Sequence, residues 1–246
     1  MNLLNHTGVV FGREIKPNLL SPWGLLITMV QPLVFLLLFG PLLPGDGSPW
    51  QWFVPGILVM LALFGTMASG YGLLMERGGG SLERLLVTPV SRTAMLLGRV
   101  LKEVVLLVAQ AVLITLVVLP LGFTLHPAGV LAGLALLALL GIGMGALSFA
   151  LAIAVRKQDS LFWAIHQTVL FPLLLLSGVL LPIDGAPGWL HAVARINPLS
   201  YVVDAERALF RGELATAAVL HGSLAVAGIA AVGLYLGTVT IRKATE

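Results

Sequence analysis

The residues that could carry catalytic chemistry are few in this sequence, and none of them stands in a catalytic motif. A nucleotide-binding P-loop places a lysine directly after a glycine, and no lysine here does so: they are Lys16, Lys102, Lys157 and Lys243. The sequence has no His-Glu-x-x-His zinc motif, no Gly-x-Ser-x-Gly nucleophile motif and no cysteine. We therefore expect a protein that is not an enzyme and that holds no metal or cofactor of its own.

Charged and turn-forming residues gather in the segment 75–92, between two apolar stretches. Gly78 to Gly80 would end the preceding helix, Ser81 can cap a new one, and Glu83 suits the positive end of its dipole. The apolar stripe of this short helix consists of Leu82, Leu85 and Leu86. Thr88-Pro89 then ends it. Such a helix needs either the membrane surface or a partner protein to cover its apolar face.

A second unusual segment covers residues 183–212. It follows a cluster of turn-forming residues and contains two short helical patterns, which Asn197-Pro198 interrupts. Each pattern has at most about 12 residues, or about 18 Å of helix, which is too short to span a bilayer. The second pattern has an apolar face that includes Tyr201, with Asp204, Arg207 and Arg211 opposite. We expect a helical hairpin that re-enters the outer leaflet, or else a structured outer loop on the surface.

The elements that must position these segments are strongly apolar. Of the 246 residues, 58% are hydrophobic and only 10% are charged, against about 25% charged in a soluble domain. Six stretches are long enough to cross a membrane: 23–42, 52–75, 94–119, 128–155, 161–181 and 215–241. The sequence therefore predicts one all-α integral membrane domain over residues 1–246 with six transmembrane helices.

The basic residues orient these six stretches. Most lie at the ends that face one side: Arg13, Lys16, Arg77, Arg84, Arg92, Arg99, Lys102, Arg156, Lys157, Arg242 and Lys243. The side rich in Lys and Arg is cytoplasmic, so we expect a multi-pass protein of the inner cell membrane with both termini in the cytoplasm. We expect Arg99, Lys102 and Glu103 to reach the interface with extended side chains. The basic residues form no stripe with aromatics, so nucleic acid is not an expected partner.

Residues 1–20 form a separate amphipathic pattern. Leu4, Phe11 and Ile15 share one helical face, and the opposite face is polar: Asn2, His6, Arg13 and Lys16. This pattern predicts a helix lying in the membrane interface, with a solvated basic leader as the alternative.

The apolar stretches themselves contain few groups that could bind or transfer a proton. His166 is the clearest exception, either as a hydrogen-bonded packing residue or as a proton relay. Pairs of glycines four residues apart recur in these stretches: Gly129 with Gly133, Gly141 with Gly145, and Gly233 with Gly237. Small residues at this spacing let helices approach closely, within the chain or across a dimer face.

Two segments resemble bacterial ABC exporter permeases of the second type, the drug and polysaccharide exporter group. The segment ERGGGSLERLLVTPVSR is similar to the loop after their second span, at Glu76, Arg77, Gly80, Ser81, Leu82, Glu83, Leu85, Leu86, Thr88 and Pro89. The segment 176–212 is similar to their region after the fifth span, at Ser177, Gly178, Pro182, Asn197, Pro198, Leu199, Tyr201, Asp204 and Arg207. The chain departs from the family at Gly78, where an acidic residue is common. That departure puts one salt bridge to the partner in doubt.

The resemblance implies a transmembrane subunit of an ATP-driven exporter. It implies pairing with a separate ABC ATP-binding subunit, which binds ATP and Mg. It also implies pairing with a second permease chain, either as a homodimer or with a related permease. It implies a coupling loop at 76–92 that docks on the ATPase through Glu76, Arg77, Ser81, Glu83, Arg84, Leu85, Leu86 and Arg92. It also implies that residues 1–20 are a connecting helix, with Phe11, Arg13, Ile15 and Lys16, and that the outer hairpin uses Trp189, Asn197, Pro198, Tyr201, Asp204 and Arg207.

The translocation pathway is expected at the axis between two permease chains. Its expected lining residues are Ser69, Trp163, Gln167, Phe171 and Ser177, with packing within the chain as the alternative. A largely apolar pathway favours an amphiphilic substrate such as a drug, an antibiotic or a lipid, which would make the protein an antibiotic-resistance exporter. The alternatives are a polysaccharide or glycolipid exporter, a secondary transporter or a structural membrane protein.

Overall fold

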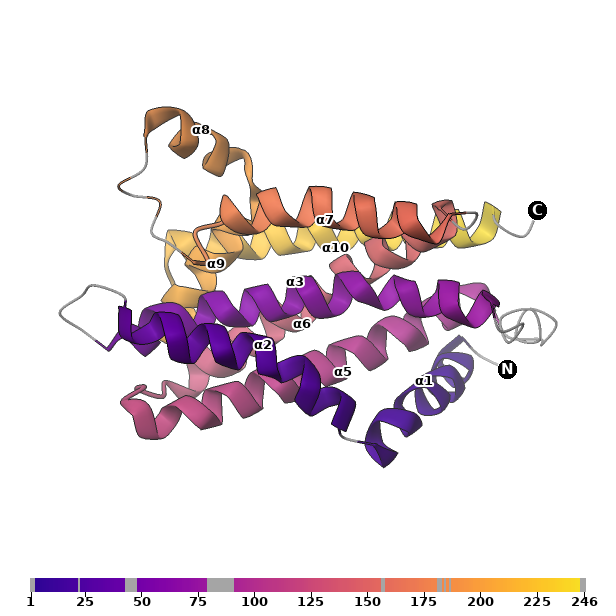
Figure 1. The fold of residues 1–246 in the computed structure, drawn as a ribbon, viewed down its shortest axis with the longest axis horizontal. Helices are drawn as coiled ribbons and strands as arrows, with labels where there is room; N and C mark the ends of the chain where they lie inside the picture. The colour runs from indigo at the N-terminus through magenta and orange to yellow at the C-terminus, as the bar shows by residue number, and fades with distance from the viewer. Residues whose placement is uncertain are drawn as a thin grey trace.

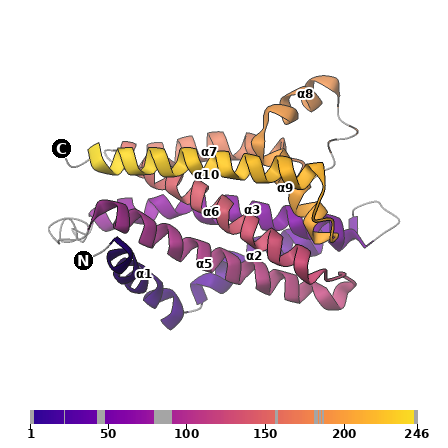
Figure 2. The same cartoon turned by 180° about the vertical axis from the view of Figure 1, so that it is seen from behind.

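The computed structural model describes residues 3–21, 23–42, 48–78, 91–155, 158–180, 183, 185 and 187–243, and regular structure in these residues is helical. The helices are α1 (Leu3–Leu20), α2 (Trp23–Phe39), η1 (Gly40–Leu42), α3 (Pro49–Gly78), α5 (Arg92–Val118), η2 (Leu119–Leu121), α6 (Pro127–Ala154), α7 (Asp159–Leu175), α8 (Gly188–Ile196), α9 (Pro198–Phe210) and α10 (Ala217–Lys243). Helices α3, α5, α6, α7 and α10 run along the long axis of the molecule, and α2 is inclined to them (Figures 1 and 2).

The bundle has two distinct ends. Helix α1 begins and α10 ends at the same end, which we call the terminus end (Figure 1). Helices α8 and α9 lie at the other end, which we call the hairpin end, and α8 projects away from the bundle there (Figures 1 and 2). The described ends of the chain therefore lie at one end of the bundle, and their placement in the cytoplasm stays a prediction.

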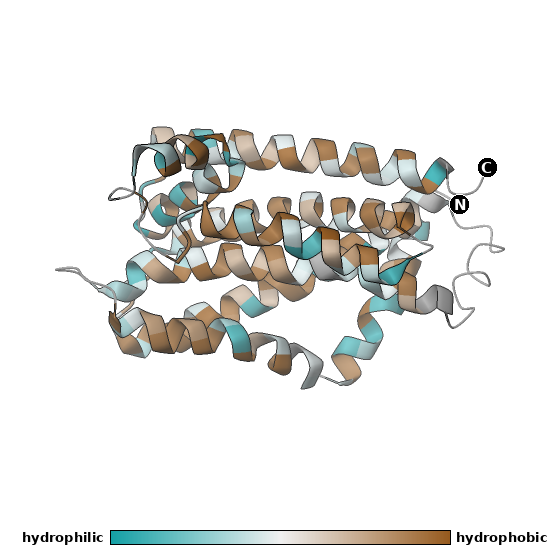
Figure 3. Cartoon of the chain, turned by 45° about the horizontal axis from the view of Figure 1, so that its top comes forward, coloured by the Kyte–Doolittle hydropathy of each residue, from teal (hydrophilic) through white to brown (hydrophobic). Residues whose placement is uncertain are grey.

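Four described helices are long and apolar enough to cross a membrane, namely α3, α5, α6 and α10. Apolar residues follow the lengths of the bundle helices, and polar residues gather toward the ends (Figure 3). Helices α2 and α7 are shorter, with 17 residues each, or about 25 Å at 1.5 Å per residue. The all-helical membrane class is confirmed, and the crossing by α2 and α7 stays a prediction.

The helix bounds follow the predicted stretches within a few residues, except in the fifth. That stretch is predicted to run to Leu181, but α7 ends at Leu175. The chain turns there because Gly178 adopts a left-handed φ of 74° and the Ser177 hydroxyl donates to the Leu174 carbonyl at 2.6 Å. Because the residues after the turn are still apolar, the prediction from hydropathy placed the end of this helix too late in the sequence.

Glycines bring the backbones of the bundle helices into direct contact. A Cβ on Gly143 of α6 would lie 2.8 Å from the Ala230 Cα of α10, and a Cβ on Gly233 of α10 would collide with the Gly143 carbonyl. Gly129 of α6 faces the Leu209 carbonyl of α9 in the same way, whereas Gly133 of α6 faces the side chains of Glu206 and Phe210. Packing within the chain is therefore confirmed for these glycines.

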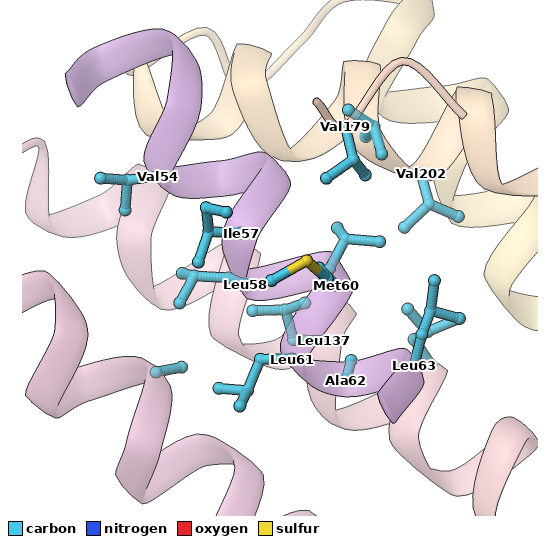
Figure 4. Packing of buried hydrophobic residues seen from close by; sticks show 14 of the residues in the cluster. Val54, Ile57, Leu58, Met60, Leu61, Ala62, Leu63, Leu137, Val179 and Val202 are labelled. Carbon is cyan, nitrogen blue, oxygen red and sulfur yellow. The ribbon is translucent and has the colours of Figure 1, made fainter. Parts of the chain in front are cut away.

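The core of the bundle surrounds α3. Its residues Val54, Ile57, Leu58, Met60, Leu61, Ala62 and Leu63 are buried, and they meet residues of three other segments (Figure 4). Leu137 of α6, Val202 of α9 and Val179 after α7 belong to the same cluster. The central position of α3 brings α6, α7 and the hairpin end into one packed unit.

Candidate functional site

A cavity of about 440 Å³ lies between α2, α3, α5 and α7. Its wall is mostly apolar, with side chains such as Ile27, Met60 and Phe64. Its polar lining residues come from these helices and from the end of α1: Asn18, Thr28, Gln31, Thr66, Lys102, Glu103, Gln110, His166 and Gln167. An apolar pocket with a few polar groups fits a ligand that has both characters.

The polar groups on the α5 side of this cavity are held in place by each other. Gln110 Nε2 donates to the Thr28 hydroxyl of α2 at 2.7 Å. Lys102 Nζ lies 2.7 Å from Glu103 Oε1, and the two side chains are only 18% and 16% exposed. The placement of Lys102 and Glu103 on a cavity differs from the interfacial one that the sequence favours. The two charges largely cancel, so this pair presents a polar group rather than a net charge to a ligand in the cavity.

An aromatic cluster forms the α7 side of the cavity. The ring centroids of Tyr71 and Trp163 are 5.1 Å apart, those of Trp163 and His166 are 5.5 Å apart, and Phe162 stacks on His166 at 5.9 Å. Trp163 is partly exposed, so its ring is available for stacking. His166 is buried among these rings, as a packing residue would be, but its Nδ1 atom has no hydrogen-bond partner among the described residues.

The structure brings together some of the predicted pathway residues and not others. Trp163 and Gln167 both line the cavity, and Phe171 is exposed farther along α7, edge-on to Phe64. Ser69 and Ser177 are not among the described lining residues, and their hydroxyls donate to backbone carbonyls of their own segments. The pathway assignment itself stays a prediction.

Helix α1 packs along the first half of α5, near the terminus end (Figure 1). Its residue Ile15 is buried and Phe11 is half-buried, whereas Arg13 and Lys16 are exposed. Gly98 of α5 allows the approach, because a Cβ there would lie 3.0 Å from the Phe11 nitrogen. Of the predicted apolar face, Ile15 is buried and Phe11 is half-buried against α5, whereas Leu4 is 80% exposed. The placement of α1 in the membrane interface stays a prediction.

Arg99 of α5 does not extend to water as the sequence analysis expects. It is 5% exposed, and its Nη2 atom lies 3.5 Å from Glu14 Oε1 of α1. Helix α1 covers this part of α5, and the guanidinium therefore pairs with a carboxylate of the protein instead of reaching water. Arg99 therefore ties the predicted connecting helix to the bundle.

Most of the predicted coupling loop lies outside the described residues. This holds for Ser81, Glu83, Arg84, Leu85 and Leu86. Glu76 and Arg77 belong to the last turn of α3, and Arg92 is the first residue of α5; only their backbone is described. The end of α3 and the start of α5 both lie at the terminus end (Figure 1).

The predicted hairpin consists of α8 and α9, with the break at Asn197-Pro198. Asn197 caps α9 by accepting from the Leu199 N–H at 3.0 Å, and its amide donates to the Leu173 carbonyl of α7 at 2.8 Å. The Tyr201 hydroxyl donates to the Arg195 carbonyl at 2.8 Å. Helix α9 is thus fixed to the end of α7, while Trp189 on α8 is exposed.

Arg207 is buried, so the exposed polar face that the sequence predicts for it is wrong, although its Nη1 atom still lies 4.0 Å from Asp204 Oδ1. It is 8% exposed, and its guanidinium carbon lies 3.7 Å from the centroid of the Trp52 ring. Its Nε donates to the Trp52 carbonyl at 3.2 Å and its Nη2 to the Gly178 carbonyl at 2.8 Å. Arg207 turns inward because these carbonyls and this ring satisfy it. It links α9 to α3 and to the turn after α7.

Two further residues of the hairpin end have no counterpart in the sequence analysis. Gln51 donates to the Phe210 carbonyl at 2.6 Å and accepts from Thr124 at 2.9 and 3.1 Å. Glu206 of α9 is fully buried, and neither carboxyl oxygen has a hydrogen-bond partner in the described part of the chain. Burial raises the pKa of the Glu206 carboxyl well above its usual range. The only sequence signal was an acidic residue among the apolar positions of α9.

Comparison with known proteins agrees with this geometry. A family model described as ABC-2 type transporter matches residues 5–210. The chain belongs to the ABC-2 type transporter family. This membership explains why the two motif segments, the bundle and the hairpin occur together in one chain.

Individual members of the ABC-2 type transporter family show the same relationship. The chain is 34% identical to a putative transport permease, ycf38, of Cyanophora paradoxa, over 77% of this chain and 68% of the relative. It is 27% identical to the daunorubicin resistance ABC transporter permease protein DrrB1 of Streptomyces coeruleorubidus, over 78% and 70%. It is 26% identical to a probable multidrug ABC transporter permease, YbhR, of Escherichia coli strain K12, over 65% of this chain and 44% of that protein. The chain is therefore an ABC transporter permease, the transmembrane subunit.

Proposed function

We propose that this permease exports an amphiphilic compound of drug, antibiotic or lipid type across the inner cell membrane, driven by a separate ABC ATP-binding subunit that binds ATP and Mg. The observation that carries the proposal is the cavity beside α7. It combines an apolar wall, a cluster of aromatic rings and the Lys102–Glu103 ion pair. Two relatives have names that refer to drugs, daunorubicin resistance for one and multidrug transport for the other.

In this proposal the bundle crosses the membrane six times, with the terminus end in the cytoplasm. The connecting helix α1 and the loop between α3 and α5 would then lie on the side where ATP is available. Two permease chains would enclose the pathway, with α7 and its residues Trp163 and Phe171 facing it. ATP binding would move the coupling loops and tilt the packed helices between two arrangements.

The substrate contact is tested with a pair of tryptophans. Trp163 lines the cavity, whereas Trp189 is exposed on α8, away from it. Trp163→Ala should remove about 1–2 kcal/mol of aromatic contact, which raises the half-saturating concentration of a planar cationic drug about 5- to 30-fold. Trp189→Ala should leave that value unchanged. The measurement is drug-stimulated ATPase activity of the permease–ATPase complex in proteoliposomes.

The results of this assay distinguish drug export from the alternative functions. Equal effects of the two tryptophan substitutions would place drug binding elsewhere. Stimulation by glycolipids but not by drugs would indicate a glycolipid exporter. Export that continues without ATP and follows an ion gradient would indicate a secondary transporter.

The coupling loop is tested separately. Exchanging its charges, Glu83→Arg together with Arg84→Glu, should uncouple the partner, so that drug no longer stimulates the ATPase. Substrate binding, measured by quenching of tryptophan fluorescence, should stay intact. Unchanged stimulation in this variant would refute the docking role of the segment.

A further inference from the structure

The carboxyl group of Glu206 occupies a space that Gly133 leaves open. Glu206 is on α9, and a Cβ on Gly133 of α6 would lie 2.6 Å from its Oε2 atom and 2.7 Å from the Phe210 ring. The side chain is fully buried, and both oxygens lack a hydrogen-bond partner among the described residues. The carboxyl and the Phe210 ring thus both lie against the α6 backbone, where any side chain at position 133 would collide with them.

Helix α9 packs tightly on both α6 and α10 at this position, and we call this packed arrangement the seated form of α9. A Cβ on Gly129 of α6 would collide with the Leu209 carbonyl, and a Cβ on Gly222 of α10 would collide with Ala205. Backbones in such close contact leave no space for the Glu206 side chain to turn toward water while α9 stays seated.

The elements packed against α9 offer the carboxyl no counter-charge in the part of the chain that the structure describes. Helix α6 has no ionisable residue, and α3 has none between Pro49 and Ala62. Among the described residues of this end, the other ionisable groups are His126 before α6, His191 and Arg195 on α8, Tyr201, Asp204 and Arg207 on α9, Arg211 and Glu213 after it, and His221 on α10.

Several of these groups have recorded partners of their own. Arg207 binds the Trp52 and Gly178 carbonyls, and Arg211 pairs with Glu213 at 3.0 Å. His126 Nδ1 lies 3.2 Å from the Phe210 carbonyl, and the His221 ring contacts Tyr201. A buried carboxylate without a counter-charge or a hydrogen bond is unfavourable, so the seated form of α9 requires the neutral acid.

We propose that Glu206 is a proton-binding site whose occupancy holds α9 seated against α6. Loss of the proton creates a charge that the packed contact between α9 and α6 cannot solvate. Helix α9 then moves away from Gly133 until the carboxylate reaches water. The ligand is a proton from the aqueous phase at the hairpin end. This property does not depend on which substrate the permease exports.

Because the sequence has no cysteine, an introduced cysteine can report by labelling whether α9 is packed against α6. Ala208 is buried on α9, and Leu214 is exposed just beyond it. Ala208→Cys therefore reports on unseating, and Leu214→Cys corrects for the faster reaction of any thiol at high pH. In the full-length chain in lipid vesicles, the ratio of Ala208→Cys to Leu214→Cys labelling by a membrane-impermeant maleimide should rise about tenfold or more between about pH 6 and about pH 9.

Adding Glu206→Gln should abolish this rise, because the amide has the shape of the acid and does not ionise. A ratio that stays constant while Glu206 is in place would overturn the proposal, and so would a ratio that rises equally with and without the Glu206→Gln substitution. A second measurement covers the case in which Glu206→Gln unseats α9 by itself.

That measurement is the infrared C=O absorption of protonated carboxylic acids. The wild-type chain should lose such a band when the pH is raised from about 6 to about 9, and Glu206→Gln should lack it. Glu213→Gln should leave the band unchanged, because the hydrogen bond from Arg211 lowers the pKa of the Glu213 carboxyl and keeps it ionised. Absence of the band from the wild-type chain at about pH 6 would overturn the proposal directly.

Discussion

The contact between α6 and α10 gives the most direct test of the fold. We predict that Gly233→Ala destabilises the bundle, because the added methyl would collide with the Gly143 carbonyl, a backbone atom that cannot rotate aside. Gly228→Ala is the matched control: it lies on the same helix, and a Cβ there meets no atom within 4 Å. Both changes gain the same helix propensity, at most about 1 kcal/mol, so their difference isolates the collision.

Overpacking of this kind costs about 1–3 kcal/mol. For a chain of this length each kcal/mol shifts the melting temperature by about 2–4 °C, so Gly233→Ala should melt about 2–12 °C below Gly228→Ala. The measurement is thermal unfolding of the detergent-solubilised permease, followed by tryptophan fluorescence. If Gly233→Ala melts at or above Gly228→Ala, the helices do not cross at this glycine and the α6–α10 packing described above is refuted.

Three further substitutions test the buried ionisable residues, again by melting temperature. Arg207→Lys should cost about 2–4 kcal/mol, since an ammonium cannot bind both carbonyls and stack on the Trp52 ring; the exposed Arg211→Lys should change stability by less than about 0.5 kcal/mol. Arg99→Gln should cost about 1–3 kcal/mol and expose α1 to protease, whereas Arg13→Gln should do neither. Glu206 binds a proton in the folded chain that the unfolded chain releases above about pH 4.3. Wild-type stability should therefore fall as the pH rises from there toward the raised folded pKa, and that of Glu206→Gln should not; equal slopes would contradict the burial of the carboxyl.

Much of this fold could be predicted because membrane helices are specified by composition over about 20 residues. The bounds of α3, α5, α6 and α10 agree with the apolar stretches within three residues. The break between α8 and α9 was also predictable, because Asn197-Pro198 is a local signal. The end of α7 was not, because the residues after Leu175 are as apolar as those before it and the turn depends on the φ of Gly178.

The residues of the candidate site also differ in how far the sequence could predict them. Trp163 and Gln167 could be named from the sequence because each is a large or polar residue in an apolar helix, and both line the cavity. The ion pair of Lys102 and Glu103 was visible as charge, but its place on a cavity depends on the incline of α2 relative to α5. Helical periodicity assigned Arg207 to a polar face, since the wheel cannot show that two carbonyls and a ring of distant segments surround that face.

Glu206 shows what such periodicity leaves out. It lies one residue before Arg207, yet the arginine binds two carbonyls, stacks on a ring and lies 4.0 Å from Asp204, whereas the carboxyl has no partner among the described residues. The difference comes from the helices opposite them: Trp52 on α3 presents a carbonyl and a ring, whereas Gly133 on α6 presents only a gap. Helix α9 can stay packed on both α3 and α6 only while Glu206 is neutral. The hairpin end therefore combines a permanent charge that fixes α9 to α3 with a removable proton that decides whether α9 stays on α6.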